Sequence, residues 1–201
     1  MVILLAAASP ARSILNEQPF GTFVSAYTDG YQLYAADLNA DGAVDLISGS
    51  SGSSSVLWTL GSGPTTLSNP LTLAHGSLLG MIDFDRDGLQ DLVMQRSILI
   101  ARSEAPPLRH PLPALIPHGE KAVVFRDRPH DPVTVVTATS SCFESTLLQS
   151  DFSTSPGIRE CMDTDLTYLS IGEVNGDALT DLVLTLGATG EVHVWLGLGS
   201  G

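Results

Sequence analysis

Short apolar stretches recur along the chain, and each is followed by a cluster of turn-forming residues such as Gly, Ser, Asn or Asp. One set of stretches lies at residues 31–36, 77–82, 121–125 and 167–172, and a second set lies at residues 56–58, 98–100, 146–148 and 192–196. Short apolar runs between turn signals are typical of strands in an all-β repeat fold. Long segments with a capped 3.6-residue period are absent, so we predict little or no helix.

An acidic motif follows three of the four stretches in the first set. It reads DLNADGAVD at residues 37–45, DFDRDGLQD at 83–91 and EVNGDALTD at 173–181. The copies begin 46 residues apart (83 − 37) and then 90 residues apart (173 − 83), which indicates a period near 45. A fourth copy is therefore expected near residue 128. Residues 127–135 fill this place as a degenerate unit, with Asp127 and Asp131 at the first and fifth positions.

A unit of this length with several short strands has the size of a propeller blade. We predict that residues 1–201 form a single all-β region, a β-propeller-type array of about four four-stranded blades. Residues 2–5 are interpreted as the last strand of a blade and residues 192–196 as its equivalent. The array is either a small closed ring or an arc of a larger one. We favour the arc, whose ends would pack against another polypeptide.

Charge and hydropathy limit the classes of partner. The net charge is −13, with 22 Asp and Glu against 9 Lys and Arg, which disfavours nucleic acid as a ligand. Apolar runs long enough to form a transmembrane segment are absent from the sequence. Residues 1–11 read either as a short secretory signal or as an ordered strand, and the sequence leaves this open. The expected location is extracellular, cell-surface or periplasmic.

The acidic motifs predict metal-binding loops. Three or four carboxylates within nine residues repel one another unless a cation lies among them, and Ca²⁺ prefers 6–8 oxygen ligands in irregular geometry. Oxygens would come from side chains at positions 1, 3, 5 and 9 and from the backbone carbonyl at position 7, and Gly at position 6 would turn the loop. Zn²⁺ is disfavoured because the loops lack Cys and His. The predicted ligands are Asp37, Asn39, Asp41, Ala43 and Asp45 in the first loop, Asp83, Asp85, Asp87, Leu89 and Asp91 in the second, and Glu173, Asn175, Asp177, Leu179 and Asp181 in a weaker third loop.

The acidic motifs could also belong to an EF-hand or to solvated turns. An EF-hand would need Glu at position 12, where the sequence has Ser48, Met94 and Leu184, so this motif is excluded. Acidic, solvated turns without any ion remain the alternative to calcium loops.

The pattern D-x-[DN]-x-D-G-x-x-D-L, followed by a β-rich run, resembles the FG-GAP/VCBS-type repeat of integrin α-chain-like β-propellers. The resemblance implies calcium loops between two strands of a blade and, usually, a seven-bladed ring. It also implies adhesion, ligand recognition or a structural role at a cell surface or in a secreted assembly. Because Glu173 and Ala178 depart from the pattern, the third loop is the least certain site.

Catalytic motifs are absent and the five His are scattered, so we expect a non-enzymatic module that binds a protein partner or neighbouring subunit. The alternative is a carbohydrate-binding or catalytic propeller with a central or inter-blade pocket, for which Trp58 and Trp195 would be sugar-stacking candidates. Cys142 and Cys161 either bridge a hairpin or are buried free thiols. Six of the nine basic residues lie between 96 and 128, where several Pro predict an exposed, irregular connection that is either solvated or docks an acidic partner.

Overall fold

The fold is known from a computed structural model that describes residues 32–49, 56–59, 71–74, 76–103, 107–113, 116 and 121–197. These residues form strands and turns and contain no helix, as the sequence predicted. None of them belongs to a helix that could cross a membrane. The expected strand at residues 2–5, the alternative interpretations of residues 1–11 and the side chain of Trp58 lie outside this description.

In the described residues, fifteen strands build four antiparallel sheets, and the strands of each sheet follow one another in chain order. The first sheet contains β1 (Gln32–Ala36), β2 (Asp45–Gly49), β3 (Val56–Thr59) and β4 (Leu71–Ala74). The second contains β5 (Leu78–Ile82), β6 (Asp91–Met94), β7 (Ser97–Ile100) and β8 (Leu108–Pro111). The third contains β9 (Lys121–Phe125), β10 (Val133–Ala138), β11 (Cys142–Leu148) and β12 (Thr154–Cys161). The fourth contains β13 (Leu166–Gly172), β14 (Asp181–Leu186) and β15 (Val192–Trp195).

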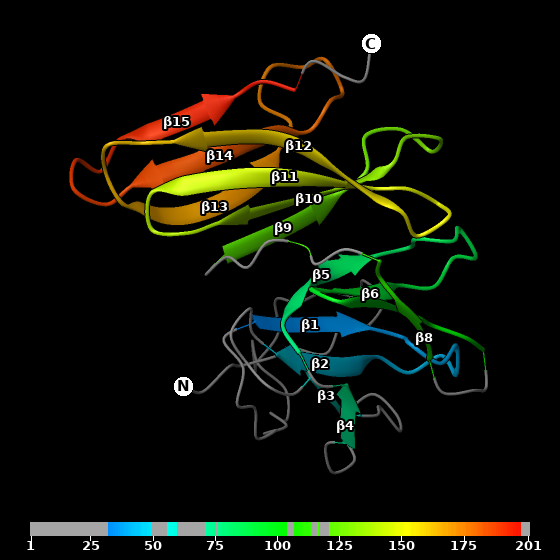
Figure 1. Cartoon of the computed structure of the whole chain (residues 1–201). Coiled ribbons are helices and arrows are strands. Elements are labelled where there is room, and N and C mark those ends of the chain that lie inside the picture. Colours follow the sequence, from blue (N-terminus) through cyan, green and yellow to red (C-terminus); the bar gives the residue numbers. More distant parts are fainter. Residues whose placement is uncertain are drawn as a thin grey trace, which may run out of the picture.

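The sheets follow one another in chain order, from the blue first sheet at the bottom of Figure 1 to the third and fourth at the top. Each sheet packs its apolar side chains against the next sheet, so the core lies in three layers between sheets. The members of the three layers are Leu38, Ile47, Leu78, Leu92, Met94, Leu99 and Ala101; Leu79, Phe84, Val93, Ile98, Ile100, Ile116, Val133, Val135 and Leu148; and Val136, Ala138, Phe143, Leu166, Leu182, Leu184 and Leu186.

The second and third sheets approach each other closely at β5 and β9. A Cβ atom at Gly80 would lie 2.6 Å from the Cγ2 atom of Val124, so only glycine fits here without displacing the neighbouring strand. Sheets that each bury one face on the next are the building principle of repeat proteins.

Two features lie at positions other than those predicted from the sequence. Residues 192–196 were interpreted as the last strand of a blade, but β15 is the third strand of its sheet, equivalent to β3, β7 and β11. The outer strands β4, β8 and β12 have no counterpart in the described part of the fourth sheet. Pairing of Phe125 with Thr134 also places the degenerate loop at residues 126–134, one residue before the span suggested by its aspartates.

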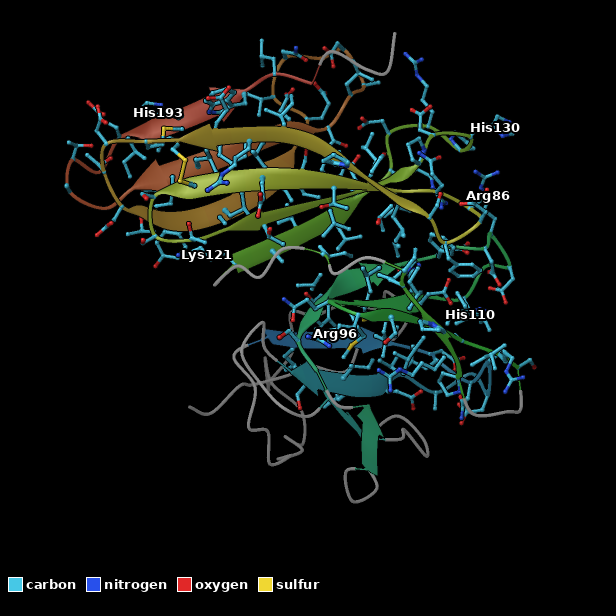
Figure 2. All side chains as sticks on the ribbon, viewed as in Figure 1. Arg86, Arg96, His110, Lys121, His130 and His193 are labelled. Carbon is cyan, nitrogen blue, oxygen red and sulfur yellow. A yellow bond between two sulfur atoms is a disulfide. The ribbon has the colours of Figure 1, made fainter. Side chains whose placement is uncertain are left out.

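The sequence left open whether the two cysteines form a disulfide, and the third sheet shows that they do. Cys142 and Cys161 lie opposite each other on β11 and β12, and a disulfide joins them across 19 residues of sequence. Disulfides are drawn in yellow in Figure 2, and this one joins β11 to β12.

Candidate metal-binding loops

Each acidic loop connects the first strand of a sheet to the second. The strand register is the same in all three cases, because the residue before the loop always pairs with the ninth loop residue. The pairs are Ala36 with Asp45, Ile82 with Asp91, and Gly172 with Asp181. The three copies of the motif therefore occupy equivalent places in three different sheets.

The loop backbone adopts the left-handed conformation at the sixth position, as predicted. The φ angles there are 82° at Gly42, 92° at Gly88 and 62° at Ala178. The fourth position is left-handed as well, with φ of 57° at Ala40, 69° at Arg86 and 84° at Gly176. The sequence does not show this second turn, because Ala and Arg carry no special preference for positive φ.

The ninth aspartate fixes the loop to the body of its sheet. Asp45, Asp91 and Asp181 are fully buried. In each loop the Oδ2 atom of this aspartate accepts a hydrogen bond from the backbone N–H at the second position, at distances of 3.1, 2.6 and 2.7 Å. The sequence pattern indicates only a metal ligand at this position and does not reveal its anchoring role.

The Oδ1 atoms of two of these aspartates accept hydrogen bonds from residues one or two positions after the third strand of the sheet. Asp91 accepts from Ala101 N–H and Asp181 accepts from Gly197 N–H, both at 2.8 Å. Burial raises the pKa of Asp91 to about 6, although its two backbone donors act in the opposite direction. A buried carboxylate that is held in this way defines the position of the whole loop.

The side chains at the third and fifth positions, Asp or Asn, turn toward the loop's own backbone. At the fifth position, Asp41, Asp87 and Asp177 accept from the N–H two residues later, each at 2.8 Å. At the third position, Asn39, Asp85 and Asn175 accept from the N–H of the fifth residue at 3.1–3.2 Å. The shared pattern makes the three loops nearly identical in local structure.

The first position distinguishes the third loop from the other two. Asp37 and Asp83 accept from the sixth-position amides of Gly42 and Gly88, at 2.8 and 3.1 Å. The longer side chain of Glu173 instead accepts from Gly176, at the fourth position. The third loop therefore differs in the contact made by its first residue, while Ala178 at the sixth position keeps the left-handed backbone.

The second loop gathers its carboxylates most closely. Oxygens of Asp83, Asp85 and Asp91 lie within 4.8 Å of one another, and this is the only such group of three in the described residues. The Oδ1 atom of Asp83 is buried and has no hydrogen-bond partner. Burial raises the pKa of Asp85, and the nearby charges of Asp87 and Asp83 add to this effect. Since Ca²⁺ binds oxygens at 2.3–2.6 Å, three oxygens at this separation fit around one ion.

The degenerate loop has the length of the others but a different chemistry. Arg126 stands at its first position and Thr134 at its ninth, where the other loops have acids. Asp127, at the second position, accepts a hydrogen bond of 2.8 Å from Thr180 N–H in the loop of the fourth sheet. The degenerate loop thus lacks the carboxylates of the first and ninth positions and instead contacts the next sheet through Asp127.

The basic stretch at residues 96–128 is more regular than predicted, because it contains the strands β7, β8 and β9. Lys121 Nζ donates to the carbonyl of Leu166 at 2.9 Å, and the His110 ring stacks on Phe152 at 4.3 Å. Lys121 and His110 of this stretch therefore connect neighbouring sheets.

The acidic loop of the second sheet also contacts the degenerate loop. Arg86 and His130, labelled in Figure 2, approach each other from these two loops, with Nη1 3.5 Å from Nδ1.

The first part of the chain is similar to a known repeat family. Residues 22–94 match the family model of the FG-GAP-like repeat, and this span contains the first two acidic loops. None of the curated proteins matches the chain.

Among solved structures, the chain is similar to the crystal structure of the V. cholerae biofilm matrix protein Bap1, with a TM-score of 0.49 and 16% identity. The match covers 81% of this chain but only 26% of that one, so this chain spans about a quarter of the length of the Bap1 structure. The family match alone confirms the predicted resemblance to FG-GAP-type repeats over residues 22–94.

Proposed function

We propose that this chain is a calcium-binding segment of a β-propeller that serves as a non-enzymatic interaction or adhesion module. The observation that carries the proposal is the common geometry of the three acidic loops, which share strand register, backbone conformation and a buried ninth aspartate. Calcium would join the carboxylates of each loop and make the turn between the first two strands rigid. The expected ligands are the fifteen residues at positions 1, 3, 5, 7 and 9 of the three loops.

The second loop supports calcium most directly. It combines three clustered carboxylates with one buried oxygen, Asp83 Oδ1, that has no hydrogen-bond partner. A buried polar atom without a partner is costly, and a bound cation would remove that cost. The first loop has the same register, and the third loop is expected to bind more weakly because of Glu173 and Ala178.

The packing of successive sheets supports a propeller-type array that continues beyond the fourth sheet. In the first two sheets, the second loop residue packs against the following sheet, so Leu38 and Phe84 are only 1% and 3% exposed. Val174, at the same position in the fourth sheet, is 57% exposed. Exposed Tyr168, Val192 and Val194 are further large apolar side chains of this sheet. An apolar end face of this kind favours a protein partner or neighbouring subunit.

The disulfide between Cys142 and Cys161 supports an extracellular, cell-surface or periplasmic location. Disulfides persist in oxidising compartments and are rare in the cytosol. Calcium is also abundant outside cells, where weak sites are filled. The acidic net charge continues to argue against nucleic acid as the partner.

A carbohydrate-binding or catalytic propeller is the weaker candidate. Trp195 is 38% exposed, and one side of its ring makes an edge-to-face contact with buried Phe143 at 5.2 Å. This contact accounts for the position of the ring by packing against the third sheet, without a sugar ligand. The packing therefore favours the interaction module.

Two matched variants test the proposal. Asp41→Ala and Asp87→Ala each remove the fifth ligand of one loop, and each is expected to lower the calcium stoichiometry in calorimetric titration by one. The rest of the array should remain folded, since stability in repeat proteins comes mostly from neighbouring units. Asp151→Ala, an exposed acid outside the loops, is the control for net charge. Unchanged stoichiometry in both loop variants would contradict the proposal.

A further inference from the structure

Arg126 occupies an unusual place in the repeat. The register of β9 and β10 puts it at the first loop position, where the other three loops have Asp37, Asp83 and Glu173. The degenerate loop therefore has a cation at the position where a calcium loop has its first ligand. Thr134 replaces the buried aspartate of the ninth position, so an anion to neutralise this cation is also missing there.

The side chain of Arg126 reaches into the acidic loop of the second sheet. Its Nη1 atom donates to the carbonyl of Asp83 at 3.0 Å, and its Nη2 atom donates to the carbonyl of Phe84 at 2.9 Å. These carbonyls belong to the first two positions of that loop. Two donors of one planar guanidinium thus hold two consecutive peptide groups, a geometry that a lysine cannot reproduce.

The guanidinium lies within the electrostatic field of the second loop. Partial burial and the charge of Arg86 lower the pKa of Arg126, whereas the carboxylates of Asp83 and Asp91 favour its charged form. Arginine nevertheless remains charged at any physiological pH. A fixed positive charge therefore stands beside the cluster formed by Asp83, Asp85 and Asp91.

The first loop has a different neighbour. The equivalent residue in the sheet that follows it is Asp83, an acid, so the first loop lacks a positive charge from that position. The two complete calcium motifs of the chain therefore differ in the charge contributed by the next sheet, although their own sequences are closely similar.

We propose that Arg126 is a built-in counter-cation of the second acidic loop, which it holds in place without calcium and whose calcium affinity it lowers. This inference rests on the proposed function. Arg126 holds the loop in place because it donates two hydrogen bonds to the loop carbonyls and because its positive charge offsets the repulsion among the carboxylates. Arg126 lowers the calcium affinity because a fixed positive charge repels a divalent cation at the same loop. Calcium would fill the first loop at lower concentration than the second.

Arg126→Gln tests both effects, with Arg128→Gln as the matched control because Arg128 is exposed, lies two residues away and carries the same charge. Calcium titration is done in the Asp41→Ala background, in which the proposed calcium site of the first loop is removed. We expect Arg126→Gln to tighten binding to the second loop about fivefold relative to Arg128→Gln, and added salt to reduce this difference. Arg126→Lys keeps the charge and should bind calcium like the parent.

Thermal melting in the presence of a chelator tests whether Arg126 stabilises the second loop when no calcium is bound. Arg126→Gln should melt at a lower temperature than Arg128→Gln, because the second loop loses the two hydrogen bonds that join its carbonyls to the third sheet. Equal calcium affinity and equal melting temperature of the two variants would overturn the inference while leaving the proposed function intact. Absence of calcium binding in every variant would instead refute the proposed function and the affinity effect, and the melting comparison would still decide the structural role of Arg126.

Discussion

The sixth loop position is left-handed in all three acidic loops, but only two of them have glycine there. A Cβ atom at Gly42 or Gly88 would meet nothing within 4 Å, so the need for glycine is conformational and not steric. Left-handed backbone costs a residue with a side chain about 1–2 kcal/mol. Ala178 carries this strain in the third loop, with φ of 62°.

Ala178→Gly is therefore expected to stabilise the protein. The gain is about 1 kcal/mol, because the relief of the left-handed strain exceeds the greater freedom of glycine in the unfolded chain. Urea unfolding measures it. Ala188→Gly, in a turn of the same sheet without positive φ, is the control and should be slightly destabilising. A loss of stability in Ala178→Gly as large as in the control would contradict the assigned loop conformation.

The sequence allows the prediction of some residue-level features but not of others. Gly42 and Gly88 could be assigned positive φ because glycine marks that conformation within a repeated motif. The left-handed Ala40 and Arg86 could not, since they carry no such preference. The position of Arg126 in the loop was not predictable. Asp127 and Asp131 have the spacing of the first and fifth motif positions, so the sequence suggests a loop that begins at Asp127. The register is set by the pairing of β9 with β10, which the loop residues do not reveal.

At the scale of elements, the buried strands were predictable and the outer strands were not. β6 and β7 are buried at every position, and their apolar runs stand out in the sequence. β12 is mostly exposed and contains Pro156 and Gly157, which usually mark turns. An outer strand needs few apolar residues, and Pro is tolerated at a sheet edge. The expected blades were thus recognisable by their inner strands alone.

The disulfide joins this outer strand to the sheet, so its removal should weaken the third sheet. Replacing both cysteines by Ser is expected to cost about 3 kcal/mol on the loop-entropy estimate for a bridge across this length. Unfolding in urea with and without reductant measures the effect. Reductant should destabilise the parent protein and leave the double variant unchanged. A reductant effect of equal size on both proteins would show that the bridge is not its cause.

At the scale of the whole molecule, the fourth sheet presents an apolar end face to solvent. We expect the isolated chain to associate through it, and Val174→Lys to reduce that association. Val44→Lys is the matched control, because Val44 is 59% exposed in the first loop. Sedimentation velocity over a range of concentrations measures both variants. A compact monomer of the parent at high concentration would contradict the partner prediction and favour a small closed ring.

The central claim is that calcium holds the acidic loops, and thermal melting tests it most directly. An ion that binds only the folded protein stabilises it by about 2.7 kcal/mol per site at a hundredfold excess over its dissociation constant. Two filled sites should therefore raise the melting temperature by about 10–20 °C, which chelator reverses and magnesium at the same concentration does not reproduce. Identical melting curves with calcium and with chelator would contradict the account.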